Sequence, residues 1–272
     1  KLDQRLFSDI DLRYVRGFDM FLQKRGCCGN TRKFYFKALR AILNRANAEG
    51  VGSVATYPFG RGGFEVSKLE EATAKRYLPA AELSKLKSTT ASNPQCEYAR
   101  KLFLFSYYCY GISFIDMAML TAAQIKQMED GDYIVYKRQK IKRQKGVKPI
   151  SIKITPAIRQ LIGSLQAASP TVDDFLLPIV TRSGYTGERL YMHIRARYSK
   201  YQKYLRLLAE ELGIDFHLTS YVSRHTAAMT LQRNNIPREV ISQMLGHADL
   251  ETTNIYLDSF DNEVINEAAK VL

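Results

Sequence analysis

The feature that most limits the fold of this chain is a largely apolar run from Leu102 to Leu120. Such a run must be enclosed either by lipid or by a protein core. Ser106, Ser113 and Asp116 interrupt it, and polar or charged side chains are costly within a membrane. We therefore predict a long helix within residues 98–120 that is buried at the centre of a folded domain. The chain has 272 residues, which is enough to form a core around such a helix.

The charge balance of the chain indicates the kind of partner it binds. Its 40 Lys and Arg residues stand against 27 Asp and Glu residues, which gives a formal net charge of +13. A basic excess of this size favours a polyanionic partner, and nucleic acid before a membrane surface. Apolar residues make up 46% and charged residues 25%, as in ordinary globular domains, which argues against a disordered or coiled-coil chain.

Residues 1–70 predict a small, basic helical domain. Two segments carry apolar side chains at helical spacing, and 13 basic residues stand against 7 acidic ones. The two apolar faces consist of Leu12, Val15, Phe18, Phe21 and Leu22, and of Phe34, Ala38, Ile42, Leu43 and Ala46. Residues 51–76 are rich first in glycine and then in charge, which is typical of a linker. We place the domain boundary near residue 70, so that the second domain covers residues 71–272.

The second domain is predicted to combine helices with a β-hairpin. Residues 132–141 and 148–155 predict two strands joined near Gly146, because isoleucines alternate with polar residues in the second segment. Helical patterns follow over residues 155–168, 191–212, 220–233 and 237–245, and again from about residue 250. The predicted fold class is mainly α with a small antiparallel β-sheet (α+β).

The densest cluster of cations lies in the predicted hairpin. Residues 137–148 hold seven Lys and Arg residues and no acid. On a strand, Arg138, Lys140 and Lys142 would project from one face, because side chains alternate with a period of two. Three cations on one face suit phosphate binding, although a solvated, charged hairpin tip is the simpler alternative.

Two further motifs follow the hairpin in order. In Tyr221-Val-Ser-Arg224-His-Thr, the tyrosine and the arginine are three residues apart and would share a helix face. In Leu245-Gly-His247, the glycine would end one helix and the histidine would follow in the turn, with Tyr256 about two turns into the next helix. Each residue alone is ambiguous, because most single histidines and tyrosines are structural. The ordered series of basic hairpin, arginine, histidine and tyrosine is far more specific.

With these motifs the chain resembles the tyrosine recombinase (phage-integrase) family over nearly its whole length. The family's second catalytic arginine lies in a His-x-x-Arg-His-Thr pattern, which residues 221–226 match except at the first position. Leu245-Gly-His247 is similar to the stretch before the nucleophilic tyrosine, and Lys140 corresponds to the lysine of the β-hairpin. The resemblance implies an N-terminal helical core-binding domain followed by a mixed catalytic domain.

The chain departs from the family pattern at two positions. Tyr221 stands where the family usually has histidine. Ser113 stands where the family's first arginine lies, since Gly111-Ile-Ser113-Phe-Ile-Asp116 replaces Gly-x-Arg-x-x-Glu. The missing guanidinium group should matter because such groups stabilise a phosphoryl transition state, and Arg138 is the candidate replacement. Integrases of the conjugative-transposon type are similar in having serine at this position.

The resemblance implies a site-specific DNA recombinase that cleaves and rejoins strands through a covalent 3′-phosphotyrosine, for integration, excision or inversion of a DNA element. The implied catalytic residues are Tyr256 as nucleophile, Arg224 and Arg138 on the phosphate, His247, Tyr221 in the family's histidine position, and Lys140 as general acid with Lys142 as its rival. Further contacts to DNA phosphates are expected from Ser113, Lys142, Arg143, Arg32 and Lys33.

No cofactor is expected for this reaction. One phosphate ester replaces another, so neither ATP nor a metal is needed, and the sequence shows neither a phosphate-binding glycine loop nor a His/Cys cluster with metal-ligand spacing. The four cysteines (Cys27, Cys28, Cys96 and Cys109) are too scattered for a disulfide framework, so we expect reduced thiols.

The expected partners are double-stranded DNA and further copies of the chain. The acidic, amphipathic tail, residues 257–272, would dock on a neighbouring subunit of a homotetramer on synapsed DNA, as the family resemblance implies, or else pack on its own domain. Lys1–Asp11 is polar and charged, unlike a secretory signal. We therefore expect a cytoplasmic, nucleoid-associated, bacterial protein without a membrane segment.

Two other classes of function stay open from the sequence. Residues 220–245, with a break at Asn234–Pro237, resemble a helix-turn-helix, which would fit a non-catalytic DNA-binding regulator. That interpretation leaves Tyr256 without a role. A type IB topoisomerase would use similar tyrosine chemistry without sequence-specific strand exchange.

Overall fold

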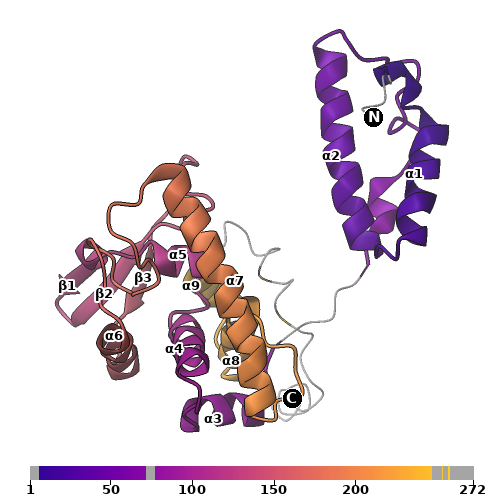
Figure 1. Cartoon of the computed structure of the whole chain (residues 1–272). Coiled ribbons are helices and arrows are strands. Elements are labelled where there is room, and N and C mark those ends of the chain that lie inside the picture. Colours follow the sequence, from indigo (N-terminus) through magenta and orange to yellow (C-terminus); the bar gives the residue numbers. More distant parts are fainter. Residues whose placement is uncertain (1–5, 72–76, 247–252, 254–256, 258–272) are drawn as a thin grey trace, which may run out of the picture. The chain divides into compact units, whose positions relative to one another are not determined.

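The computed structural model describes residues 6–71 and 77–246, together with Thr253 and Leu257. The chain divides into two compact units, Lys1–Ala74 and Lys75–Leu272 (Figure 1). Helices dominate both units, and the second unit adds a three-stranded antiparallel sheet, which confirms the predicted fold class.

The first unit is built on two helices. Helix α1 spans Leu12–Lys24, and the Asp11 carboxylate caps it by accepting the Tyr14 N–H at 2.8 Å. Helix α2 spans Gly29–Ala48. Short 3₁₀ turns lie at Phe7–Asp9 and Val66–Leu69. The buried residues of the core are Val15, Leu22, Phe36 and Val66.

Part of the segment expected to be a linker belongs to this core. Val66 is buried, and Phe59, Phe64 and Leu69 pack against the same cluster. The ring of Phe64 lies 4.6 Å from that of Phe36, measured between centroids. The aromatic residues decide the structure of this segment, because their burial outweighs the conformational freedom that its glycines confer.

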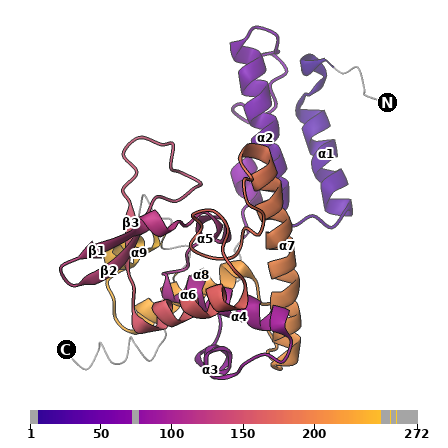
Figure 2. The ribbon, with the colours of Figure 1, turned by 60° about the vertical axis from the view of Figure 1, so that its left-hand side comes forward.

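Helix α4 (Pro94–Tyr108) lies at the centre of the second unit. The Asn93 side chain caps it by accepting the Gln95 N–H at 2.8 Å, and proline occupies the first helical position. Every side chain over residues 102–107 is buried. The helix packs against α3 (Ala80–Ser88), α6 (Pro156–Ala168), α7 (Gly187–Glu211) and α8 (Ser220–Arg233), as Figures 1 and 2 show. The prediction that the apolar run forms the centre of a core is confirmed.

The long buried helix predicted within residues 98–120 is confirmed only as far as Tyr108, because the chain turns between α4 and α5 (Phe114–Ala118). Tyr110 and Gly111 have φ angles of +57° and +72°, which lie in the left-handed region and end a right-handed helix. Ser113 caps α5, its hydroxyl oxygen accepting the Asp116 N–H at 3.3 Å. Both sides of the turn are buried, so apolar composition alone does not reveal it.

The sheet consists of β1 (Ile125–Met128), β2 (Gly131–Tyr136) and β3 (Ile150–Lys153), in that spatial order. A short 3₁₀ turn, Ala122–Gln124, precedes β1. Ile134 pairs with Ile152, and both are fully buried. Strand β1 was not predicted, because most of its residues are exposed and its sequence lacks apolar–polar alternation.

The strand predicted over residues 132–141 is wrong beyond Tyr136. Residues 137–149 form a loop, in which the Ile141 N–H donates to the Arg138 carbonyl at 3.1 Å and closes a turn. The expected strand face with Arg138, Lys140 and Lys142 is therefore also wrong. A paired strand would hold these like charges close together, whereas a loop lets them separate in water.

The remaining helices complete the second unit. Helix α9 (Arg238–Leu245) ends at Gly246, whose φ of +64° provides a left-handed stop. The helices predicted over residues 155–168, 220–233 and 237–245 are confirmed, and α7 starts before the predicted residue 191. The helix predicted from about residue 250 lies outside the described residues. Within the described ranges, no helix is long and apolar enough to cross a membrane.

The core of the first unit can be tested on α2. Phe36→Ala should lower the free energy of unfolding of this unit by about 3–5 kcal/mol, because the ring is fully buried. Phe34→Ala, on the same helix but 69% exposed, should change it by less than about 0.5 kcal/mol. Hydrogen exchange of the α2 amides in the full chain measures both values. Equal losses would contradict this core.

Candidate active site

Arg224 lies at the centre of the candidate site. It belongs to α8, and only 3% of it is exposed. Its Nη1 donates to the Gly111 carbonyl at 3.0 Å, and its Nη2 donates to the Leu245 carbonyl at 2.5 Å. The guanidinium group therefore connects the turn after α4 with the C-terminal end of α9.

Gly111 is the residue that allows this turn to reach Arg224. A Cβ atom at position 111 would lie 2.4 Å from the Arg224 Cα atom, and the φ of +72° disfavours any side chain. Next to this contact, the Ser106 hydroxyl donates to the Ile112 carbonyl at 2.8 Å and lies 2.7 Å from Ser223 Oγ. These contacts fix the turn after α4 and join α4 to α8.

Arg138 reaches the same helix end from the loop between β2 and β3. Its Nη1 donates to the Gly246 carbonyl at 3.4 Å, and the side chain is half-buried. The C-terminal end of a helix carries partial negative charge, so it attracts both guanidinium groups. The Arg138 Nε is buried and has no hydrogen-bond partner in the described part of the chain. Arg138 and Arg224 thus converge on adjacent carbonyl groups.

Gly246 permits this convergence sterically. A Cβ atom there would lie 2.3 Å from Ile150 Cδ1 and 3.3 Å from Arg138 Cδ. The end of α9 therefore packs directly on β3 and on the Arg138 side chain, which a larger residue would push away.

Asp116 holds the loop segment that follows Arg138. Its carboxylate is buried, Oδ1 accepts the Gln139 N–H at 2.7 Å, and Oδ2 accepts the Ser113 hydroxyl at 2.6 Å. Gln139 lies between Arg138 and Lys140, so the carboxylate fixes the backbone that carries both cations. Ser113 is thereby engaged in capping α5 and in binding Asp116.

Tyr136, at the end of β2, reports the charges around the site. Burial raises the pKa of its hydroxyl above the ordinary value of 10.0, and the Asp116 carboxylate raises this pKa further, whereas Arg224 and Arg138 lower it. The hydroxyl therefore stays protonated at neutral pH. Asp116, Arg224 and Arg138 are therefore all close enough to the Tyr136 hydroxyl to shift its pKa.

Lys140, Lys142 and Arg143 are exposed in the loop between β2 and β3. Lys140 directly follows Gln139, whose N–H is bound by Asp116. The other two cations lie farther along the loop. Of these three cations, Lys140 is therefore the one next to the backbone that Asp116 holds.

Tyr221 lies one helical turn before Arg224 and is 53% exposed. Its ring meets the His225 ring edge-on, with 5.1 Å between centroids. Tyr221, Ser113, Arg138 and Arg224 line one pocket of about 430 Å³. The structure thus brings these sequence-predicted site residues together.

His247 and Tyr256 lie outside the described residues, as does the tail after Leu257. Gly246, which precedes His247, carries the carbonyl that Arg138 binds. Leu257 is buried against Ile241 and Leu245 of α9 and Ala228 of α8. The residue after Tyr256 is therefore anchored on the helix that both arginines reach.

Arg32 and Lys33, expected to contact DNA phosphates, have acidic partners within the first unit. Arg32 Nη1 lies 2.9 and 3.0 Å from the two carboxylate oxygens of Asp19, which joins α2 to α1. Lys33 Nζ lies 2.7 Å from Glu70 Oε2. The charge of both cations is therefore largely neutralised where they lie.

Residues 220–245 form two consecutive helices, as a helix-turn-helix would, and α9 would be the helix that enters a DNA groove. The role of α8 in the site is independent of that interpretation. Helix α8 packs against α4 and α7, and it buries Ser223, Arg224 and Thr226 along with its apolar residues. It is a core helix that delivers an arginine to a pocket.

Sequence reasoning named Ser113 and Asp116 but missed the turn before them and the bond from Gln139 to Asp116. Ser113 followed three residues later by Asp116 was an available signal, because this spacing is typical of a helix N-terminus. It would have revealed the turn at Gly111. The bond between Asp116 and Gln139 joins separate segments, and no local pattern predicts it.

Comparison with known families decides the class of protein. Residues 76–263 match the Phage integrase family, and residues 1–65 match the Phage integrase SAM-like domain. The chain belongs to the phage integrase family. The family resemblance drawn from the motifs is thereby confirmed.

Several curated proteins are similar to parts of the chain. Tyrosine recombinase XerC of Rhodospirillum centenum is 31% identical over 114 residues, which are 42% of this chain and 31% of that protein. Tyrosine recombinase XerD of Halalkalibacterium halodurans is 43% identical over 54 residues, 20% of this chain and 18% of that protein. Transposase B from transposon Tn554 of Staphylococcus aureus is 24% identical over 196 residues, 72% of this chain and 30% of that protein. The chain spans about a third or less of the length of these relatives.

Solved structures share the fold at low sequence identity. XerH recombinase in a post-cleavage complex with its difH substrate has a TM-score of 0.68 at 19% identity, covering 97% of this chain and 73% of that one. The Tn1549 transposon integrase with circular intermediate DNA has a TM-score of 0.66 at 13% identity, covering 97% and 86%. A lambda integrase dimer on a core site has a TM-score of 0.65 at 15% identity, covering 96% and 85%.

The close approach at Gly111 can be tested against a glycine with space around it. Gly111→Ala should lower the free energy of unfolding by about 2–4 kcal/mol, because both the contact with Arg224 and the left-handed angle oppose a side chain. Gly213→Ala has a similar φ of +61° and no atom within 4 Å, so it should cost only about 1 kcal/mol. Urea denaturation of both variants measures the difference. Equal costs would show that Arg224 does not constrain position 111.

Proposed function

We propose that this chain is a site-specific DNA recombinase that cleaves and rejoins strands through a covalent 3′-phosphotyrosine. The observation that carries the proposal is the convergence of Arg224 and Arg138 on the C-terminal end of α9, directly before His247, in a member of the phage integrase family. A pair of guanidinium groups beside a histidine and a tyrosine suits a phosphodiester, whose non-bridging oxygens accept hydrogen bonds from planar donors.

The role proposed for the arginines is to bind the scissile phosphate. Each guanidinium group has five N–H donors, and the backbone carbonyls hold it in one orientation. The Arg138 Nε needs an acceptor that the described residues do not provide, and a phosphate oxygen would supply one. Groups already held in place stabilise the charge of the transition state without reorganising during the reaction.

The covalent step needs no outside reagent. The Tyr256 oxygen attacks phosphorus, a P–O bond to tyrosine forms, and the bond from phosphorus to the 5′-oxygen breaks. A tyrosine hydroxyl has a pKa of about 10, so cations at the phosphate are needed to favour its ionised form. The 5′-hydroxyl of another strand can then reverse the step, because one ester replaces another.

The remaining proton transfers are assigned from the motifs. Lys140 is proposed to protonate the 5′-oxygen, since Asp116 fixes the backbone beside it, with Lys142 as the alternative. His247 would donate a hydrogen bond to the phosphate or accept the proton of Tyr256. Tyr221, at the pocket beside Arg224, would take the place of the family's histidine as a hydrogen-bond donor.

Ser113 is proposed to mark a subgroup in which Arg138 acts in place of the first arginine. The Ser113 hydroxyl is bound to Asp116, and the Arg138 side chain lines the same pocket. A guanidinium group from the loop can therefore occupy the place where an arginine at position 113 would act.

The partners follow from the same proposal. Double-stranded DNA would be gripped by the basic first unit, a core-binding domain over about residues 1–70, and by the catalytic domain over about residues 71–272, with Lys142 and Arg143 on phosphates. In a homotetramer on synapsed DNA, the acidic tail, residues 257–272, would dock on a neighbouring subunit. Leu257 itself packs on α9, so only the residues after it would reach the neighbouring subunit. Such a reaction places the protein with DNA in the cytoplasm.

The covalent intermediate is the direct test. Duplexes selected for binding from a randomised pool, and then nicked near their centre, should trap wild-type protein as an SDS-resistant adduct. Tyr256→Phe should bind the same duplexes and give no adduct, because it lacks the attacking oxygen. Gel electrophoresis of labelled DNA measures both. Absence of an adduct with wild-type protein, or its persistence in the variant, would refute the proposal.

The roles of the loop cations can be separated by leaving-group chemistry. Arg138→Ala and Lys140→Ala should each slow cleavage by about 10²-fold or more, whereas Lys145→Ala in the same loop should not. A duplex with sulfur in place of the 5′-bridging oxygen has a leaving group that needs no proton. It should restore cleavage in Lys140→Ala but not in Arg138→Ala. If the sulfur-containing duplex restored cleavage in both variants, or in neither, these assignments would be contradicted.

A further inference from the structure

The pocket beside the two arginines extends further than a phosphate requires. It has a volume of about 430 Å³ and continues from Arg138 and Arg224 along one face of α7. Tyr191, Ile194 and Tyr198 lie on this face at spacings of three and four residues, and Phe114 of α5 contacts Tyr198. A phosphate uses only the polar part of such a space.

The aromatic wall of this pocket is held in place. The Gln202 amide donates to the Tyr198 hydroxyl at 2.9 Å, and this hydroxyl lies 3.1 Å from Ser220 Oγ at the start of α8. The Phe114 ring lies 5.3 Å from the Tyr198 ring and stacks on the Tyr201 ring at 5.1 Å. Tyr198 and Phe114 are therefore already held in place before a ligand binds.

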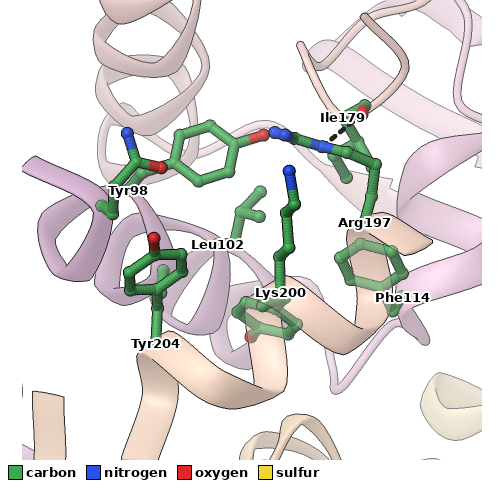
Figure 3. A pocket seen from close by; sticks show the side chains of 10 residues that line it. Tyr98, Leu102, Phe114, Ile179, Arg197, Lys200 and Tyr204 are labelled. Atoms are coloured by element: carbon green, nitrogen blue, oxygen red, sulfur yellow. Dashed lines mark hydrogen bonds between the residues drawn. The ribbon is translucent and has the colours of Figure 1, made fainter. Parts of the chain in front are cut away.

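The opposite side of the same wall is anchored as well. Figure 3 shows Phe114 together with Arg197 and Lys200 of α7 around a second, smaller pocket. There the Arg197 Nε donates to the Ile179 carbonyl at 3.1 Å, and the Tyr98 hydroxyl of α4 donates to the Pro178 carbonyl at 2.9 Å. These bonds join both α7, which carries the tyrosines, and α4 to the segment before α7.

The chemistry of the larger pocket selects its ligand. Tyr191 is 59% exposed, so one of its faces is open to contact. Arg195, one turn along the same helix, adds a third arginine, and none of the described residues that line the pocket is acidic. A ligand that matches aromatic rings beside cations has a flat apolar face and a negative charge, as a nucleotide has.

We propose that this pocket receives a nucleobase that leaves the duplex next to the cleaved phosphodiester. The base lies against Tyr191 and Tyr198, and its own phosphate binds Arg195. A base inside a duplex is stacked on both faces, so it reaches these rings only after it unstacks. This inference rests on the proposed recombinase function, since a strand that is to join another duplex must first separate from its complement.

The test varies the base and the tyrosines together. Binding is measured by fluorescence anisotropy in a Tyr256→Phe background, on selected duplexes that are paired, mismatched or abasic at each position beside the cleavage point. The mismatched duplex should bind at least about 10-fold more tightly than the paired one, because less unpairing is required. Tyr191→Ala and Tyr198→Ala should weaken binding of the mismatched duplex by about 5- to 150-fold.

Two comparisons make the result specific. On the abasic duplex, the two alanine variants should bind as tightly as the Tyr256→Phe parent does. This result would also show that they are folded. On the mismatched duplex, Tyr191→Phe should keep the affinity of the parent, because it keeps an aromatic ring. Met192→Ala, on the same helix and 52% exposed but not part of the pocket, serves as the control. Equal losses on mismatched and abasic duplexes, or no loss on either, would overturn the inference. Adduct formation with Tyr256 intact is measured separately, so failure of the recombinase proposal is recognised independently.

Discussion

The candidate site depends on the C-terminal end of α9. The carbonyl groups of Leu245 and Gly246 accept hydrogen bonds from Arg224 and Arg138, which come from a core helix and from a loop. A buried guanidinium group is costly without acceptors, and a helix end provides oriented acceptors that need no counter-charge from an acid. Gly111 is needed because Arg224 must approach the backbone closely. The positions of the elements around the site follow from these contacts.

Acid and cation are kept apart in this arrangement. Asp116 binds a hydroxyl and a backbone N–H rather than a guanidinium group. It thereby fixes the loop between Arg138 and Lys140 without the bidentate ion pair that would occupy an arginine's donors. The pocket is lined by arginines and aromatic rings, with Arg195 and Tyr191 on the same helix, and none of its described lining residues is acidic. Such a lining suits a ligand with an anionic backbone and flat apolar rings.

The sequence predicted most helices because each has its own signal of caps and apolar spacing. It failed where local signals conflict with tertiary contacts. The run from Leu102 to Leu120 looks like one helix, since both sides of its turn are buried. The left-handed angles at Tyr110 and Gly111, and the approach of Gly111 to Arg224, account for the break. The strand predicted as far as residue 141 ends at Tyr136, and the chain continues as a cationic loop that Asp116 binds at Gln139. Strand β1 is exposed, so no periodicity marks it.

By itself, the sequence determined the family, the order of its motifs and the residues Arg224, Lys140, His247 and Tyr256 as candidates, because residue types at fixed spacing carry that information. Only the tertiary structure decided that Arg138 reaches the end of α9 and that Asp116 holds the loop, because these contacts join segments far apart in the chain. Their geometry depends on packing around α4, which no local pattern encodes.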